Sequence, residues 1–462
     1  MLLVSASAPA ETIHLKNGRT ILVDSVRENG TRYEYEIGDD TYAIPKSSVE
    51  RIEAGGMPAS ASGSGGKNAI ELPAFVPADS VANQGDLLQS VIKEGKVDTD
   101  ALAKLEGKGN VELSATADFV AGKFEFDHGN VDQARRYFDS ALRFQPENAT
   151  VLIYYAALLV RTGNASQAMP YAQRAVAAAP DSADAYTVLG YVQEACDRTK
   201  DAVASWKHSL ELRPDARVEQ YIAKAQREQS AEGDFAQRES SHFVLHYEGK
   251  QTSEAFREQI LAALESDYDD LSRDLGTPPR DNILVTLYTE QAFFDVTRAP
   301  SWTGALNDGK LRIPVNGLSS LTPELARVLK HELAHSFINS LSSSRCPHWL
   351  NEGIAQLVEP KSLSGDGRQL GQLFKTQRNI PLNVLEGSFM QFSGAQAYVA
   401  YAESLAAVSY INDTYGMSDI QRILQRLGEG SSTEAALRAT VHSDYGQLES
   451  ELAKYLSDKY GD

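Results

Sequence analysis

Cysteine, basic charge and long apolar runs are scarce in this sequence of 462 residues. Its two cysteines, Cys196 and Cys346, are too few for a disulfide framework or for a thiolate zinc site. It has no run of about 18 apolar residues, the length that a membrane-spanning helix needs. Lys and Arg number 44 against 63 for Asp and Glu, a net charge of −19, and so acidic a surface repels the phosphates of nucleic acids. We therefore expect neither a transmembrane segment nor a nucleic-acid partner.

The remaining composition is that of a folded protein with several domains. Hydrophobic residues make up 42% of the chain and charged residues 23%, which is ordinary for globular proteins. At about 100 to 200 residues per domain, the length leaves room for two to four domains. The patterns described below predict a multidomain α+β protein.

Residues 1–10 resemble the end of a signal peptide. A short apolar stretch precedes Ala6-Ser7-Ala8, a cleavage pattern of the A-x-A kind. The basic region and most of the apolar core of a signal peptide are missing, so the loose start of a cytoplasmic protein is the alternative. We expect a periplasmic or secreted protein, with a cytoplasmic location as the second choice.

Two short segments of different composition follow. Residues 11–53 alternate apolar and polar side chains between turn signals such as Asn17-Gly18 and Asn29-Gly30, which predicts a small antiparallel β domain. Residues 54–83 are rich in Gly, Ser and Pro, and we expect them to form a flexible linker.

Residues 84–231 contain a repeat with a period of 34 residues. Three copies, at about 113–146, 147–180 and 181–214, align in the columns Pro146, Pro180, Pro214; Gly122, Ala156, Gly190; and Ala134, Ala168, Ala202. Gly129 and Gly163 share a further column, in which the third copy has Asp197. The pattern resembles the tetratricopeptide repeat, whose stacked helix pairs form a superhelix with a concave surface for a protein partner. We expect flanking capping helices: a degenerate helix pair at 84–108 and a terminal cap at 216–230.

Residues 240–462 have a mixed pattern of strands and helices. Apolar segments at 242–247 and 283–288 predict strands, with a long helix between them. A third strand at 309–315 is interpreted in two ways. In the first interpretation the strand offers its backbone groups to an extended peptide. In the second it is an ordinary edge strand shielded by Lys310 and Arg312. From residue 322 onward the pattern is mainly helical.

The segment His331-Glu332-Leu333-Ala334-His335 carries the chemistry. It lies in a periodic segment that begins with Thr322 as N-cap and Pro323 in the first turn, so it is placed on a helix. Residues i and i+4 project from one face, so His331 and His335 can bind one tetrahedral zinc ion. Glu332 then lies beside the open coordination position as a general base. Two helix histidines with purely structural roles are the alternative.

A third ligand is needed, and the candidate is Glu352. A metzincin-like site would have a third histidine at position 341, which is Leu. Seventeen residues after His335 comes Glu352, in the segment Trp349-Leu350-Asn351-Glu352-Gly353-Ile354-Ala355. A helix–loop–helix turn of this length can return a carboxylate to the metal.

The two motifs together, HELAH and WLNEGIA, resemble the gluzincin zinc peptidases. The resemblance covers about residues 240–460 and implies one zinc ion per chain, bound by His331, His335 and Glu352. It also implies a Tyr or His from the downstream helices as oxyanion stabiliser, for which Tyr398 and Tyr401 are candidates. The sequence departs from thermolysin-like enzymes at Gln356, where they have an Asp that orients a ligand histidine.

Further substrate-binding candidates are Gly304, Ala305, Asn307 and His348. The segment 304–308 loosely resembles the strand along which gluzincin aminopeptidases bind their substrates, where a Glu holds the free amine. Asn307 occupies that position, which favours cleavage within a chain. His348 is interpreted as a solvated loop residue or a substrate-side wall, because three protein ligands plus water is the catalytic arrangement.

The sequence thus predicts a zinc-dependent peptidase, with an endopeptidase favoured over an exopeptidase, whose repeats recruit a protein partner or substrate. A catalytically silent adaptor with a peptidase-like scaffold is the alternative, although the intact Glu332 argues against it. Because an activated water also attacks other carbonyls, hydrolysis of a bond other than a peptide bond is a third possibility.

Overall fold

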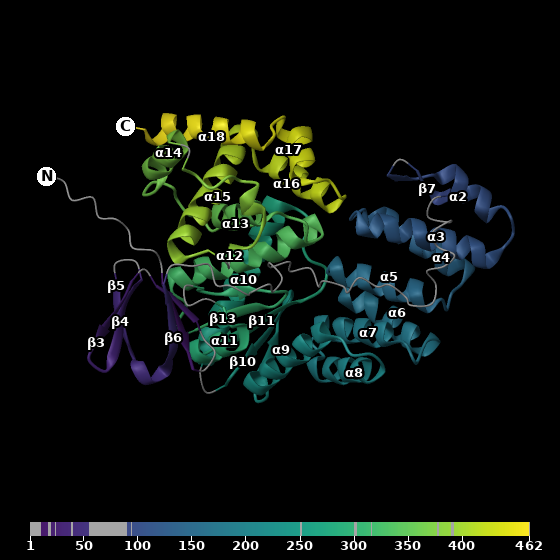
Figure 1. Cartoon of the computed structure of the whole chain (residues 1–462), viewed down its shortest axis with the longest axis horizontal. Coiled ribbons are helices and arrows are strands. Elements are labelled where there is room, and N and C mark those ends of the chain that lie inside the picture. Colours follow the sequence, from purple (N-terminus) through teal and green to yellow (C-terminus); the bar gives the residue numbers. More distant parts are fainter. Residues whose placement is uncertain are drawn as a thin grey trace.

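The computed structural model describes residues 11–16, 20–23, 25–37, 40–54, 90–93, 95–249, 252–299, 303–315, 317–376, 378–389 and 392–461. The expected signal-peptide remnant at 1–10 and nearly all of the expected linker at 54–83 lie outside these residues. In Figure 1 the N-terminal strands lie on one side of the C-terminal domain and the helical repeats on the other. In the part of the chain that is described, no helix is both long enough and apolar enough to cross a bilayer.

The N-terminal unit consists of two small antiparallel sheets. Their strands are β1 (Glu11–Leu15), β2 (Thr20–Val23), β3 (Ser25–Asn29), β4 (Arg32–Ile37), β5 (Asp40–Pro45) and β6 (Val49–Ala54). One sheet has the order β2-β1-β6 and the other the order β3-β4-β5. Their core is small, with Ile13 and Val49 as its fully buried members among the described residues. This architecture agrees with the predicted small antiparallel sheet.

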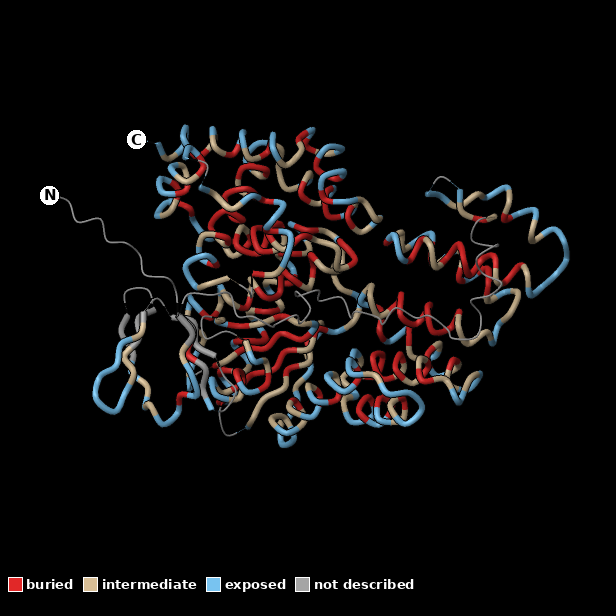
Figure 2. Tube along the Cα trace, in the orientation of Figure 1, coloured by how far each residue is buried: buried red, intermediate tan, exposed pale blue. Residues whose placement is uncertain are grey.

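Three helix pairs follow the repeat in the sequence. They are α3 (Val111–Asp127) with α4 (Val131–Phe144), α5 (Ala149–Arg161) with α6 (Ala165–Ala178), and α7 (Ala183–Ala195) with α8 (Thr199–Leu212). The column of small residues is explained by close helix contact. A Cβ on Gly122 would lie 2.6 Å from the ring of Phe138, and one on Gly190 would lie 2.3 Å from Nε1 of Trp206. Figure 2 shows buried residues along the inner faces of these helices.

Another column of the repeat is explained by backbone conformation. Gly129 and Gly163 have φ values of 77° and 70°, in the left-handed region where glycine costs least. Asp197 adopts the same conformation in the third copy, with φ of 58°. The carboxylate of Asp197 lies 3.2 Å from Nζ of Lys310 and 3.1 Å from Nε2 of His246, both in the C-terminal domain. The departure from the repeat therefore provides a contact between domains.

The described residues show the expected helix pair at 84–108 only in part: Ser90 and Val91 are helical, and one full helix follows. A two-stranded hairpin, β7 (Ile92–Lys93) and β8 (Lys96–Val97), precedes the helix α2 (Thr99–Glu106). Gly95 turns the hairpin with φ of 72°. The hydrophobic contacts of Val91, Leu102, Ala117 and Ala121 attach this unit to α3.

The C-terminal domain combines a five-stranded sheet with helices. The strands are β9 (Ala236–Glu239), β10 (Phe243–Tyr247), β11 (Ile283–Tyr288), β12 (Leu306–Asn307) and β13 (Leu311–Pro314), in the order β12-β13-β11-β10-β9. β10, β11 and β13 are parallel, whereas β9 and β12 are antiparallel to their neighbours. The helices are α10 (Glu254–Leu275), α11 (Glu290–Thr297), α12 (Pro323–Ser342), α13 (His348–Val358), α14 (Gly367–Lys375), α15 (Gly394–Tyr415), α16 (Met417–Gly428), α17 (Thr433–Val441) and α18 (Tyr445–Tyr460). Two short 3-10 turns lie at Lys46–Ser48 and Val384–Glu386.

The prediction of an edge strand at 309–315 is wrong. β13 lies inside the sheet, and the edge is formed by β12. Lys310 and Arg312 are 7% and 1% exposed, so they shield no edge from solvent. They are buried because the helix α9 (Ala216–Glu232), expected as a terminal cap of the repeats, lies against this face of the sheet.

Ion pairs connect α9 and the third repeat to β13. The Arg312 guanidinium lies 2.8 Å from Glu228 Oε1 and 2.9 Å from Asp308 Oδ1. Nζ of Lys310 lies 3.1 Å from Glu194 Oε1. Burial opposes the charged forms, but the surrounding carboxylates hold the pKa values of Lys310 and Arg312 above their ordinary range. Removing one member would leave its partners buried and uncompensated.

A second contact connects the first repeat to the C-terminal domain. The guanidinium of Arg345 packs against Gly129 so closely that a Cβ there would lie 1.3 Å from Nη1. Nη2 of Arg345 donates to the carbonyl of Gly430 at 3.2 Å. A Cβ on Gly430 would in turn lie 2.3 Å from Oδ1 of Asn130. The repeat array therefore contacts the C-terminal domain at both of its ends.

Candidate metal and active site

The helix α12 carries both histidines of the HELAH segment. Thr322 caps the helix by accepting from the backbone N–H of Leu325 at 3.1 Å, and Pro323 stands in its first turn. The rings of His331 and His335 have their centroids 4.9 Å apart, as expected for residues one turn apart on one face.

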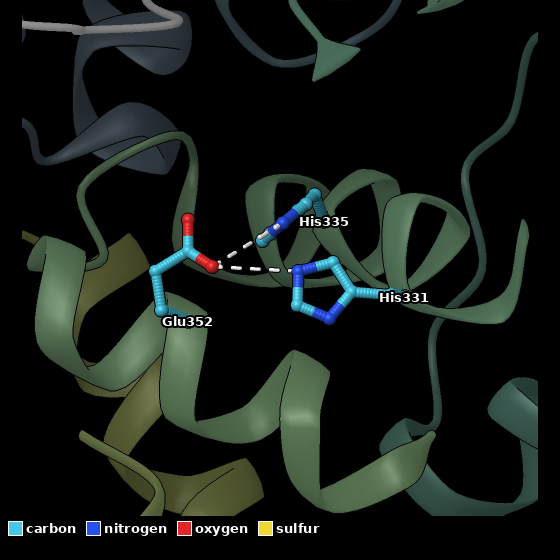
Figure 3. A group of neighbouring side chains, drawn as sticks. All are labelled: His331, His335 and Glu352. Atoms are coloured by element: carbon cyan, nitrogen blue, oxygen red, sulfur yellow. Dashed lines mark ion pairs between the residues drawn. The ribbon is translucent and has the colours of Figure 1, made fainter. Parts of the chain in front are cut away.

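The helix α13 brings Glu352 to the same point. Oε2 of Glu352 lies 3.4 Å from Nε2 of His331 and 3.9 Å from Nε2 of His335. One ligand atom from each of the three residues lies within 4.8 Å of the other two, and Figure 3 shows the carboxylate directed at both rings. The site depends on tight packing behind it, since a Cβ on Gly353 would lie 2.4 Å from the carbonyl oxygen of Ser404 in α15.

The donor set fits a divalent metal. Oε2 of Glu352 is buried and makes no hydrogen bond with the described residues, although it faces two imidazole nitrogens. Burial acts to raise the pKa of Glu352, but the neighbouring histidines hold it at about 2. Burial likewise opposes protonation of His331, but Glu352 and Glu359 raise its pKa to about 10. A carboxylate and two imidazoles whose ligand atoms lie this close together are suitable zinc ligands.

Two residues orient the histidines, and the sequence analysis did not identify them. Nδ1 of His335 lies 2.7 Å from Oδ1 of Asn351, which in turn lies next to Asn339. Nδ1 of His331 lies 3.6 Å from Oε2 of Glu359. Seven residues separate Glu352 from Glu359, two helical turns, and this spacing is the signal in the sequence that could have identified Glu359.

Gln356 has a different role from the aspartate that thermolysin-like enzymes have there. It is 1% exposed, and its amide nitrogen donates to the backbone carbonyl of Tyr401 at 2.9 Å. Its oxygen accepts from Nζ of Lys361 at 3.0 Å. The side chain therefore joins α13 to α15, and the orienting carboxylate comes from Glu359 one turn later.

Glu332 lies in the same buried region. It is 7% exposed, and burial raises the pKa of its carboxyl above the ordinary value, against the opposing effect of His335 and His331. Its backbone carbonyl accepts from the amide of Asn307 at 2.7 Å, and the same amide donates to Oγ of Ser336 at 2.8 Å. Asn307 thus joins the edge strand β12 to α12.

The two tyrosine candidates occupy different environments. Tyr401 is half-buried, and Glu352 and Glu332 lie near enough to add to the effect of burial in raising its pKa. Tyr398 is 58% exposed, and its hydroxyl donates to Oδ1 of Asp366 at 2.5 Å. The structure therefore does not bring Tyr398 to the site. Tyr398 points toward solvent and Asp366, whereas Tyr401, three residues later in α15, is directed into the protein.

The remaining candidates surround the site in part. His348 is not a solvated loop residue, because it begins α13, and its Nε2 lies 3.5 Å from Oε1 of Glu352. Burial lowers its pKa, and its ring meets that of Phe389 edge-on with centroids 4.4 Å apart. Gly304 is exposed with open space beside it, whereas Ala305 is 7% exposed and belongs to the core.

Comparison with known proteins identifies two regions of the chain. A family model described as Peptidase MA superfamily matches residues 268–458, and one described as Tetratricopeptide repeat matches residues 125–190. The chain therefore contains a Peptidase MA superfamily domain in its C-terminal part and a tetratricopeptide repeat region before it. No curated protein matches the chain.

Solved structures with similarity to the chain include two of different kinds. One is a MamA fragment of Desulfovibrio magneticus RS-1, 21% identical, covering 29% of this chain and 76% of that chain with a TM-score of 0.26. The other is a mutant O-GlcNAc transferase of Thermobaculum terrenum, 14% identical, covering 76% of this chain and 98% of that chain with a TM-score of 0.23.

Proposed function

We propose that the protein is a zinc-dependent peptidase of the gluzincin type that cleaves within polypeptide chains. The observation that carries the proposal is the buried, unpartnered Oε2 of Glu352, which faces Nε2 of His331 and of His335. The Peptidase MA superfamily match supports it, since members of that superfamily are often zinc-dependent.

In this proposal His331, His335 and Glu352 hold one zinc ion per chain. When bound, zinc polarises the scissile carbonyl and lowers the pKa of a coordinated water to about 7. Asn351 and Glu359 hold the two imidazoles with Nε2 toward the metal, because each contacts the opposite ring nitrogen. Their role is to keep the ligands in position before the metal arrives.

Glu332 is the proposed general base. Its carboxylate takes a proton from the attacking water and delivers it to the nitrogen of the leaving amine, so it ends the cycle in its starting state. The buried surroundings that raise its pKa also favour the protonated form that the second step needs. Tyr401, the half-buried tyrosine near both glutamates, is the proposed donor to the oxyanion.

Cleavage within a chain is favoured by the position of Asn307. The side chain that would stand near a free amine is an amide rather than a carboxylate, and it is held by Glu332 and Ser336 of α12. β12 is the edge strand of the described sheet, and an edge strand is where an extended substrate can add to a sheet. Gly304, Ala305 and His348 remain proposed neighbours of the substrate.

Two further parts of the proposal rest on the sequence. The repeats would recruit or position a protein partner or the substrate, as repeats of this kind suggest. The pattern at residues 1–10 supports a periplasmic or secreted location, which the N-terminal sequence of the mature protein in cell fractions would test.

Metal analysis combined with the Glu332→Gln variant tests the function. We expect about one zinc per chain in both proteins, and cleavage of peptides from a proteome-derived library by the wild type only. Glu324→Gln, an exposed position in the first turn of the same helix, is the matched control and should remain active. Absence of zinc, or cleavage that survives Glu332→Gln, would refute the proposal and favour a silent adaptor.

A further inference from the structure

A cavity of about 320 Å³ lies between the repeat array and the C-terminal domain. On the repeat side its wall includes the rings of Tyr191, Trp206 and Tyr221, which pack against one another with centroids 5.1 to 5.8 Å apart. On the other side it is lined by α12 and by the turn between β12 and β13. Neither domain encloses this space alone.

The C-terminal domain presents small polar side chains to the cavity. Ser336, Asn339 and Ser340 line it, three residues on one side of α12 that are only half-buried. The hydroxyl of Ser340 and the amide nitrogen of Asn339 make no hydrogen bond with any described residue. These groups are free to bond a ligand that carries backbone-like donors and acceptors.

The cavity begins close to the proposed metal site. Asn339 and Ser340 follow His335 by four and five residues, which places them about 6 to 8 Å farther along the helix axis. Asn339 also contacts Asn351, the residue that orients His335, with 3.4 Å between Nδ2 of Asn351 and Oδ1 of Asn339. A chain that reaches the metal needs only a few residues more to reach the cavity.

The edge strand leads to the same place. Asn307 belongs to β12, and the residues that follow it, Asp308 and Gly309, line the cavity. β12 is the last strand of the described sheet, and a peptide that lies antiparallel along it runs against the direction of that strand. Its residues on the amino side of the scissile bond therefore extend past Asn307 into the cavity.

We propose that the cavity is a substrate subsite built jointly by the repeats and the peptidase-like domain, which binds about two or three residues of an extended polypeptide on the amino side of the scissile bond. The inference rests on the proposed peptidase function. An extended chain advances about 3.3 Å per residue, so these would be residues roughly two to five positions from the bond. The lining combines aromatic rings, hydroxyl and amide groups and charged side chains such as Arg161, Lys224 and Asp281, which suits the side chains and backbone of an unfolded segment.

Such a subsite makes the repeats part of substrate binding. Binding energy gained away from the reacting bond can be used to position that bond. Short peptides would then be cleaved poorly even when their sequence at the scissile bond is suitable.

The first experiment varies substrate length. A peptide that the enzyme cleaves is extended by about two and about four residues on its amino side, or by the same number on its carboxyl side. We expect kcat/KM to rise about tenfold or more with the amino-side extension, and less with the carboxyl-side extension. No dependence on length, or a gain confined to the carboxyl side, would overturn the proposal.

The second experiment fills the cavity. Ser340→Tyr adds a ring at a wall position, and Ser340→Ala at the same position adds no volume. The amino-side gain in kcat/KM should fall about tenfold in Ser340→Tyr, which fills the cavity, and by much less in Ser340→Ala, which loses one hydroxyl but leaves the space open. Equal gains in the two variants would overturn the proposal, and circular dichroism and zinc content would show whether Ser340→Tyr keeps its fold.

A binding measurement separates this inference from the proposed function. In the Glu332→Gln background, the intrinsic tryptophan fluorescence, to which Trp206 in the cavity wall contributes, is followed while the extended peptide is added, for Ser340→Tyr and Ser340→Ala. Saturable binding by the alanine variant, weakened about tenfold or more by the tyrosine, supports the subsite whether or not the wild type hydrolyses peptides. Equal binding by both, or none, refutes the subsite even if the wild type is an active zinc peptidase.

Discussion

The carboxylate of Asp197 lies 3.1 Å from Nε2 of His246, across the boundary between the third repeat and the sheet. Asp197 stands in the left-handed conformation that glycine adopts in the two preceding repeats, so the contact is formed at a strained position. His246 and Lys310 hold the pKa of Asp197 below its ordinary value despite burial. The exchange of glycine for aspartate is therefore explained by the neighbouring domain.

Asp197→Gly should destabilise the protein even though it restores the residue of the repeat. The substitution relieves about 1 kcal/mol of backbone strain but leaves Lys310 with one buried partner fewer, for a net loss of about 1 to 3 kcal/mol. The reciprocal control is Gly163→Asp. Gly163 occupies the same turn of the second repeat, and no described atom lies within 4 Å of a Cβ there. Urea denaturation measures both, and a gain in stability for Asp197→Gly would contradict the explanation.

Arg312→Met should cost about 3 to 5 kcal/mol of the free energy of unfolding. The loss leaves Glu228 and Asp308 buried without their guanidinium partner, and it weakens the connection between α9 and the sheet. We expect the repeat array and the C-terminal domain of the variant to unfold in more widely separated transitions than those of the wild type. Arg438→Met, which removes an exposed pair with Glu434, is the control and should cost less than about 1 kcal/mol.

Glu359→Ala should weaken zinc binding about 10- to 100-fold, because His331 loses the carboxylate on its Nδ1 side. Competition with a chromogenic chelator measures the affinity. Glu359→Gln keeps an acceptor for the ring nitrogen and should recover part of the loss. Glu429→Gln, an exposed glutamate that also follows the end of a helix, is the control. An unchanged affinity in Glu359→Ala would remove Glu359 from the site.

Gly353→Ala should disrupt the site through the backbone. Its Cβ would lie 2.4 Å from the carbonyl oxygen of Ser404, so α13 and α15 must separate at the residue after Glu352. We expect a loss of about 1 to 3 kcal/mol and weaker zinc binding. Gly371→Ala, also in a helix but with its nearest contact at 3.8 Å, should be neutral or stabilising. Thermal unfolding with and without zinc distinguishes the two variants.

Asp118→Asn should stabilise the protein at neutral pH. Burial, with a smaller contribution from the nearby carboxylate of Glu106, raises the pKa of Asp118 to about 7. Because the folded state retains the proton more firmly than the unfolded chain, this residue's contribution to stability is lost as pH rises from about 4 to about 7. The difference between variant and wild type in urea denaturation should therefore grow from pH 4.5 to pH 8, whereas Asp234→Asn, at an exposed position, should show no such trend. A difference that does not change with pH would contradict this assignment.

The sequence predicted those features that depend only on residues close together in the chain. The period of four residues in HELAH places His331 and His335 on one face, and the glycine columns correspond to close contacts and left-handed turns in the structure. The tetratricopeptide region and the peptidase-like domain of the prediction are confirmed at the level of families. Roles of individual residues in catalysis stay predictions.

Features that depend on packing between distant segments could not be predicted. Alternation in β13 suggested a solvent face for Lys310 and Arg312, because the sequence does not show that α9 covers it. Tyr398 and Tyr401 were equivalent in the sequence, and only the direction of α15 separates them. The orienting role of Glu359 could not be predicted from the comparison with thermolysin-like enzymes, because their aspartate corresponds to position 356, four residues after Glu352.

The position of α9 bears on how these modules could be exchanged between proteins. This helix is both the last helix of the array and a covering layer of the sheet, and its Glu228 is buried against Arg312. A different repeat array fused in front of β9 would leave Arg312 and Tyr288 without the acidic partners that Glu228 and Glu232 supply. A fusion protein that carries the peptidase-like domain must therefore include α9. The structural unit of that domain begins near Ala216 rather than at its first strand.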